Sequence, residues 1–154
     1  MSEQAALHQL TLAGLGHRCA QESDHFFHRR PHDPRYCYEL FRRAIVERSE
    51  HAWELLYRQY QALVAGWVRR HEAYGHSGEE IHYFVNRAFE KMWSAVTPEK
   101  FANFQNLKSL LGYLATCVNS VLMDNARSAE RRALEESEDR IERLPGVRIP
   151  HQEV

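Results

Sequence analysis

Hydrophobic residues recur three and four positions apart along most of this chain, which is the spacing that places them on one face of an α-helix. The clearest pattern lies in residues 79–132, where an apolar stripe over residues 81–96 precedes a loop and a second stripe covers residues 107–122. No segment alternates polar and apolar residues long enough to predict a strand. We therefore expect an all-α protein, folded as a compact helical bundle.

Residues 1–35 are expected to form an N-terminal helical extension that ends in a proline-containing connection. Their apolar pattern is loose, and two glycines predict a break near His17. Pro31 and Pro34 predict the connection, because proline does not fit a helix interior. We expect this extension to pack on, or be tethered to, the main body.

The main body is expected to occupy residues 36–134. Helices are predicted over residues 36–48 and from residue 50 to near Gly75, the second with Ser49 as its N-cap. We interpret the aromatic stripe of this second helix as core. The last helix is expected to run from about residue 106 to residue 138, and residues 135–154 to hold its end and an acidic, flexible tail.

The charge distribution limits the partners that this chain can attract. A formal net charge of −1 gives no overall attraction to nucleic acid, so such binding would need a local patch. Residues 107–134 hold four Lys or Arg against two Asp or Glu, whereas residues 135–154 hold three against six. No apolar run approaches the ~20 residues of a membrane span, and the N-terminus lacks a signal-peptide pattern. We therefore expect a cytoplasmic protein without a membrane partner.

Cysteine and histidine usage gives little support for a disulfide or a metal. Cys19, Cys37 and Cys117 are odd in number and widely spaced, so no disulfide framework is expected, and Cys117 is interpreted as a small core residue. No two cysteines are close enough for the paired ligands of a zinc site. We interpret the remaining members of the N-terminal cluster as surface histidines: His17, His25, His28 and His32.

Two features of residues 97–132 have the chemistry of a nucleic-acid interface. The loop between the two stripes is rich in phenylalanine and side-chain amides, which stack on bases and bond to their edges: Phe101, Asn103, Phe104, Gln105 and Asn106. The second helix turns basic toward its end, where Arg127, Arg131 and Arg132 could hold phosphates. We expect the loop to lie beside these cations, so that an everted base can be gripped.

From about residue 40 to residue 132, the order of the helices resembles the region 2 domain of bacterial sigma factors, particularly the extracytoplasmic-function type. Residues 52–70 look like the first helix of that domain: AWELLYRQYQALVAGWVRR. Residues 79–96 are similar to the next helix: EEIHYFVNRAFEKMWSAV. Residues 107–132 resemble the third: LKSLLGYLATCVNSVLMDNARSAERR.

Three short sequence motifs support this resemblance. The F-x-x-x-W step of the family is matched by Phe89 and Trp93. An aromatic-Leu step is matched at Tyr113, and a D-x-x-R step by Asp124 and Arg127. The individual motifs are short, and their order and spacing carry the likeness.

The resemblance implies a transcription initiation factor that binds core RNA polymerase and the single-stranded −10 region of promoter DNA. The DNA-binding residues would be Phe101, Asn103, Phe104, Gln105, Asn106, Lys108, Tyr113, Asn119, Ser120, Arg127, Arg131 and Arg132. The face that docks on the coiled-coil clamp of the polymerase β′ subunit would consist of Glu80, Tyr83, Asn86, Arg87 and Glu90. An anti-sigma or other regulatory protein is a further expected partner.

Three departures from the family pattern bear on these expectations. Tyr83, Asn86 and Arg87 stand where the family carries an acidic residue and then Gln-Glu, so Arg87 reverses a charge on the polymerase-facing side. Ser120 replaces the asparagine usually found four residues before the helix aspartate, and Asn119 lies next to it. Only twenty residues follow Leu134, too few for the second domain that would read the −35 element. We therefore expect an excised piece, a protein that works without that domain, or one that borrows it from a partner.

Two other functions fit parts of the sequence. A helical adaptor derived from such a domain could bind proteins without binding DNA. A di-metal carboxylate enzyme could use the Glu-x-x-His pairs Glu22–His25 and Glu79–His82, but the second pair lies in a first helical turn and no interior glutamate accompanies it. No nucleophile–base pair, glycine-rich phosphate loop or zinc-protease motif occurs, so we expect neither an enzyme nor a cofactor.

Overall fold

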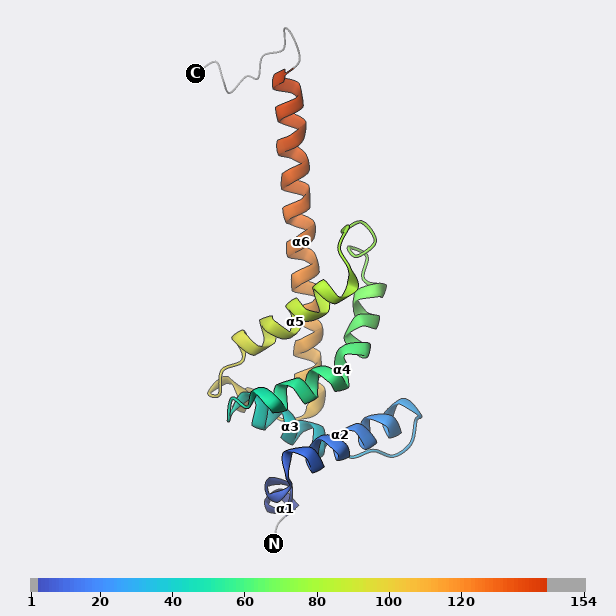
Figure 1. Ribbon diagram of the computed structural model, residues 1–154, viewed down its shortest axis with the longest axis vertical. Helices are drawn as coiled ribbons and strands as arrows, with labels where there is room; N and C mark the ends of the chain where they lie inside the picture. The colour runs from blue at the N-terminus through green and yellow to red at the C-terminus, as the bar shows by residue number, and fades with distance from the viewer. Residues whose placement is uncertain (1–2, 144–154) are drawn as a thin grey trace.

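The computed structural model describes residues 3–143, with side chains from residue 6 onward, and these residues form helices and no strand. The expectation of an all-α protein is therefore confirmed. In chain order the elements are α1 (Glu3–Gln9), α2 (Leu12–Phe27), α3 (Arg35–Ile45), α4 (Glu50–Arg70), α5 (Ile81–Ala95), the 3₁₀ helix η1 (Lys100–Asn103) and α6 (Leu107–Arg143) (Figure 1). The tail predicted after residue 143 lies outside the described residues.

The break in the N-terminal extension lies at Thr11, so the prediction of a break near His17 is wrong. The Thr11 hydroxyl accepts a hydrogen bond from the Gly14 backbone N–H at 3.0 Å and so caps α2, which continues through both glycines. At Gly16 the helices approach closely, because a Cβ there would lie 3.1 Å from Leu55 Cδ1. This glycine permits helix contact and does not end the helix.

A serine cap and a buried stripe define α4. Ser49 Oγ accepts a hydrogen bond from Ala52 N at 3.2 Å, which confirms it as the N-cap. The helix ends at Arg70, before the expected end near Gly75, and a series of turns leads to Gly78, whose φ of +74° suits glycine.

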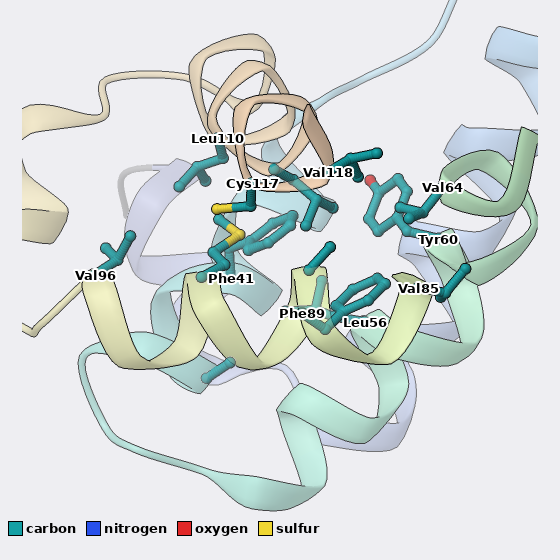
Figure 2. Close-up of a cluster of buried hydrophobic side chains, with 14 of the residues drawn as sticks. Phe41, Leu56, Tyr60, Val64, Val85, Phe89, Val96, Leu110, Cys117 and Val118 are labelled. Atoms are coloured by element: carbon teal, nitrogen blue, oxygen red, sulfur yellow. The ribbon is translucent and has the colours of Figure 1, made fainter. Parts of the chain in front are cut away.

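The core forms where α3, α4, α5 and the first half of α6 meet, with α2 packed against one side (Figure 2). Leu56 and Phe89 come from α4 and α5, and Leu110, Cys117 and Val118 come from α6 (Figure 2). Cys117 is 3% exposed and unpaired, which confirms its interpretation as a core residue. Buried apolar area of this kind is the main source of stability for such a bundle.

The second half of α6 leaves the core. No residue of α6 beyond Leu122 is buried, and the helix projects from the body along the long axis of the molecule (Figure 1). At 1.5 Å per residue its 37 residues span about 55 Å. This part of the helix is stabilised by its own backbone hydrogen bonds and by local side-chain pairs such as Arg143–Asp139 (2.9 Å).

A disulfide joins Cys19 of α2 to Cys37 of α3, so the expectation of no disulfide is wrong. The connection between these helices lets the chain turn back, and the two Cα atoms lie 4.6 Å apart although 18 residues separate them in sequence. Spacing along the chain did not reveal this proximity. The extension is thus both packed on the main body and covalently tethered to it.

A buried glutamate fastens the extension a second time. Glu39, 4% exposed, accepts hydrogen bonds from Arg42 Nε (2.7 Å) and Arg43 Nε (2.9 Å), and Arg43 Nη2 also donates to the Leu7 carbonyl oxygen (3.0 Å). Burial alone would raise the pKa of Glu39, but the hydrogen bonds from the two arginines outweigh it and lower the pKa. The carboxylate is therefore charged in the folded protein.

Replacing this carboxylate should destabilise the protein more at neutral pH than in acid. Glu39→Gln is expected to lower the free energy of unfolding by about 2 kcal/mol at pH 7, because two partly buried guanidinium groups lose their partner. The folded-state pKa lies below the ordinary value of 4.5, so the stabilisation is present above that value and is lost as the pH falls through the folded pKa. Urea unfolding at pH 7 and pH 3 measures both effects.

The matched control is Glu47→Gln, since Glu47 also pairs with Arg42 (2.6 Å) but is exposed. It should cost less than about 1 kcal/mol at either pH. Equal losses in the two variants, or a Glu39→Gln deficit as large at pH 3 as at pH 7, would contradict this account of Glu39.

Candidate nucleic-acid interface

The loop between α5 and α6 is anchored by Phe101, whose side chain is 7% exposed. Its ring packs against the Tyr38 ring with centroids 5.3 Å apart, inside the core. A buried ring cannot stack on a base, so the prediction that Phe101 contacts DNA is wrong. Its role is to fix the loop to the body.

A second anchor acts on the backbone of the same loop. The Tyr38 hydroxyl donates a hydrogen bond of 2.6 Å to the Phe104 carbonyl oxygen, and burial raises the pKa of Tyr38, which keeps the hydroxyl protonated. The Phe104 ring is half-buried and meets the Tyr113 ring edge to face at 5.4 Å. Both rings retain partial exposure, as stacking on a base requires.

The amide side chains of the loop divide into two kinds. Asn103 and Gln105 are exposed, as expected for groups that bond to base edges. Asn106 instead caps α6, because its Oδ1 accepts a hydrogen bond from Ser109 N at 2.8 Å. Its carbonyl group is therefore already engaged within the protein.

Two exposed lysines give this surface its positive charge. Lys108 lies in the first turn of α6, as expected, and Lys100 lies in η1. Lys100 was missing from the residues predicted to bind DNA, although its place in the loop is visible in the sequence. We call the set Asn103, Phe104, Gln105, Lys108, Tyr113 and Lys100 the loop surface.

The basic end of α6 is not beside the loop. Arg127, Arg131 and Arg132 are exposed on the projecting half of the helix. Since α6 is continuous from Leu107 to Arg143, its rise places Arg127 about 30 Å from the loop. The expectation that loop and arginines form one grip on a base is therefore wrong.

Asn119 and Ser120 are tied to the neighbouring helices. Asn119 Oδ1 lies 2.8 Å from His71 Nε2, and Ser120 Oγ accepts a hydrogen bond from Lys91 Nζ. Lys91 also lies 3.5 Å from Asp124, which accepts a hydrogen bond from Arg127. That hydrogen bond lowers the pKa of Asp124, so the carboxylate stays charged. Ser120 and Arg127 thus belong to a polar network along the α5–α6 seam, whereas Asn119 is tied to the end of α4.

The residues predicted to face polymerase are all exposed, in or just before α5: Glu80, Tyr83, Asn86, Arg87 and Glu90. Their spacing of three and four residues puts them on the side of the helix opposite its buried stripe. Asn86 Oδ1 accepts a hydrogen bond of 2.5 Å from the Tyr57 hydroxyl, and the Arg87 guanidinium lies 5.8 Å from the Tyr83 ring.

A groove of about 490 Å³ runs between this face of α5 and the projecting half of α6. Tyr83 and Arg87 line one side, and Arg131 and Arg132 line the other. Acidic residues also line it: Glu79, Asp124 and Glu135. The groove thus brings together two sets of residues that the sequence had assigned to different partners. Arg131 and Arg132 were predicted to hold phosphates, and Tyr83 and Arg87 were predicted to contact polymerase. We call this the α5–α6 groove.

The described residues contain no group of three His, Cys, Asp or Glu side chains placed to hold a metal ion. Glu22 and His25 lie 3.5 Å apart, whereas His82 is in the first turn of α5, just after Glu79. The described helices also include none with the length and apolar character to span a bilayer.

Comparison with known proteins adds no family. No family model, no curated protein and no solved structure matches this chain.

Removing the Tyr38 hydroxyl should loosen the loop. Tyr38→Phe is expected to lower the free energy of unfolding by about 1 kcal/mol, because the buried side of the loop loses one hydrogen bond to the Phe104 carbonyl. Urea unfolding measures the loss, and hydrogen exchange should quicken in residues 97–106. Tyr83→Phe, at an exposed tyrosine of α5, is the control and should change neither quantity. Identical hydrogen exchange of the loop in the wild type, Tyr38→Phe and Tyr83→Phe would show that the Tyr38 hydrogen bond does not hold the loop.

Proposed function

We propose that this chain is a transcription initiation factor of the sigma region 2 type, which binds core RNA polymerase and single-stranded −10 promoter DNA. The observation that carries the proposal is the loop surface: a loop pinned by Phe101 and Tyr38 that presents exposed amides beside two half-exposed rings. A reading surface of this kind is organised before the ligand arrives, so little ordering cost accompanies binding.

The loop surface suits one or two unstacked bases better than a duplex. Phe104 and Tyr113 offer ring edges and faces, and Asn103 and Gln105 offer donors and acceptors within the same short segment. Stacking on aromatic rings contributes about 1–3 kcal/mol per base in single-strand binding proteins. Lys100 and Lys108 would contact the flanking phosphates, in the role previously expected of the distant arginines.

Polymerase binding is assigned to the exposed face of α5. That face would dock on the β′ coiled coil through a helix-on-helix contact, with Tyr83 as its largest apolar side chain. A factor of this kind works in the cytoplasm, where disulfides are rare. The Cys19–Cys37 disulfide of this structure would be unusual in that compartment.

A second candidate function, a protein-binding adaptor or regulator without DNA binding, is favoured by the α5–α6 groove. The groove mixes cations with carboxylates and lies between two helices, which suits a charged helix of a partner protein such as an anti-sigma factor. Arg87 gives this face a charge opposite to that of the family it resembles.

DNA binding by the loop surface is tested with a fluorescently labelled single strand of −10-like sequence and a scrambled strand. Asn103→Ala combined with Gln105→Ala should lower affinity for the −10-like strand about tenfold, because base-edge contacts are lost. Lys108→Ala should reduce the slope of log affinity against log salt by about 0.7, the contribution of one phosphate contact on a single strand. Fluorescence anisotropy over a salt series measures both quantities.

The control for charge is Arg58→Ala, at an exposed cation of α4 outside both surfaces, which should leave affinity and slope unchanged. Arg131→Ala should also leave them unchanged, because Arg131 lies about 30 Å or more from the loop. Loss of binding in Arg131→Ala alone would move the DNA site to the groove. No single-strand binding, together with no co-purification with core polymerase, would overturn the proposal in favour of the adaptor.

A further inference from the structure

A pocket of about 720 Å³ opens where the N-terminal extension meets the main body. Its wall is built from α2, α3, α4, the start of α6 and the connection between α2 and α3, and it shares no residue with the α5–α6 groove. The volume lies within the 300–1,000 Å³ typical of small-molecule sites. The pocket depends on the extension, because α2 and the connection form one side of it.

The lining is mostly apolar and aromatic. Phe26 and Phe27, at the end of α2, are 56% and 52% exposed, with ring centroids 5.5 Å apart. Leu63 and Trp67 of α4 and Leu111 of α6 line the pocket as half-buried side chains. Large apolar side chains left open to solvent around one concavity mark a surface that another molecule covers.

The polar groups of the pocket favour an uncharged ligand. Glu22 Oε1 accepts a hydrogen bond from Asp33 N (2.6 Å), and Asp33 pairs with Arg35 (2.7 Å), so both carboxylates already have partners. Their negative charge would repel an anion. Lys108 and His32 also line the pocket, and both are exposed, so water can solvate them without a ligand.

One polar atom at the inner wall has no partner. The Tyr60 side chain is 3% exposed. Among the described residues, its hydroxyl is the one buried side-chain polar atom that makes no hydrogen bond. Burial raises the pKa of Tyr60 to about 12, with a small opposing effect from the nearby Ser23 hydroxyl, which lies 3.5 Å from Cys37 Sγ. Tyr60 therefore retains its proton as an unused hydrogen-bond donor.

We propose that this pocket binds an uncharged, largely apolar small molecule that carries a carbonyl or ether oxygen at its inner end. The rings of Phe26, Phe27 and Trp67 would cover the apolar part, and the oxygen would accept the Tyr60 hydroxyl proton in a hydrogen bond. An orphaned buried donor at the end of an apolar pocket is the feature that selects such a ligand over a pure hydrocarbon. The site shares Lys108 with the loop surface and shares no residue with the polymerase-facing side of α5.

The probe is prodan, an uncharged naphthalene ketone whose emission shifts to the blue in apolar surroundings. Titration of the full chain should show saturable binding of one molecule with a blue shift. Gly112→Phe and Ala115→Phe, two α6 positions in the pocket wall, should each weaken binding at least tenfold by filling the space. A Cβ at Gly112 meets no atom within 4 Å, so the fold accepts the larger residue there. Ala133→Phe, on exposed α6, is the control and should bind as wild type does.

The donor is tested by competition between 2-acetylnaphthalene and 2-ethylnaphthalene, which differ in the ketone oxygen. In the wild type the ketone should displace prodan about five times more effectively, the worth of one net hydrogen bond. Tyr60→Phe should abolish this preference and still bind the hydrocarbon. Circular dichroism confirms that each variant is folded. Absence of saturable binding, unchanged binding in both filling variants, or a ketone preference that survives in Tyr60→Phe would overturn the proposal.

Discussion

Burial of one face of the first half of α6 against α4 and α5 is the contact on which the other features depend. Leu110, Leu114 and Val118 are at most 2% exposed, and each fully buried side chain of this kind contributes roughly 1.5–3 kcal/mol relative to an exposed one. This seam sets where α6 begins, and therefore where the preceding loop must lie. It also ends at Leu122, so the same helix that closes the core projects beyond it.

Because the seam covers only the first half of α6, this helix carries two separate surfaces, one at its start and one beyond its buried half. The loop surface lies at the start of α6, and the α5–α6 groove lies beyond its buried half. About 30 Å between them exceeds the Debye length of about 8 Å at physiological salt, so the arginines of the groove cannot stabilise a phosphate held at the loop. Each surface must bind its own partner, or one partner must be long enough to span both.

Sequence periodicity was sufficient to predict the helices and most of the core, because 3.6-residue spacing reports directly which face is buried. The Ser49 cap and Cys117 were predicted for similarly local reasons. The break at Thr11 was missed because a threonine cap outweighs two glycines that a helix can tolerate. The Cys19–Cys37 bond was missed because contact between helices is not encoded in spacing along the chain.

The candidate site was predicted less well than the fold, for a reason visible in two phenylalanines. Phe101 and Phe104 are equivalent in sequence terms, yet the 3₁₀ turn directs one into the core and leaves the other half-exposed. The prediction that the arginines lie beside the loop failed for a different reason, because residues near a loop in sequence can lie a helix length away from it in space. Exposure and distance along a rigid helix come only from the three-dimensional structure.

The most direct test of the account is nuclear magnetic resonance mapping of a −10-like single strand on the full chain. The account predicts that backbone amide shifts concentrate at Asn103, Gln105 and Lys108, with none at Arg131 and Arg132. Shifts confined to Tyr83, Arg87 and the two arginines, with the loop unaffected, would contradict it.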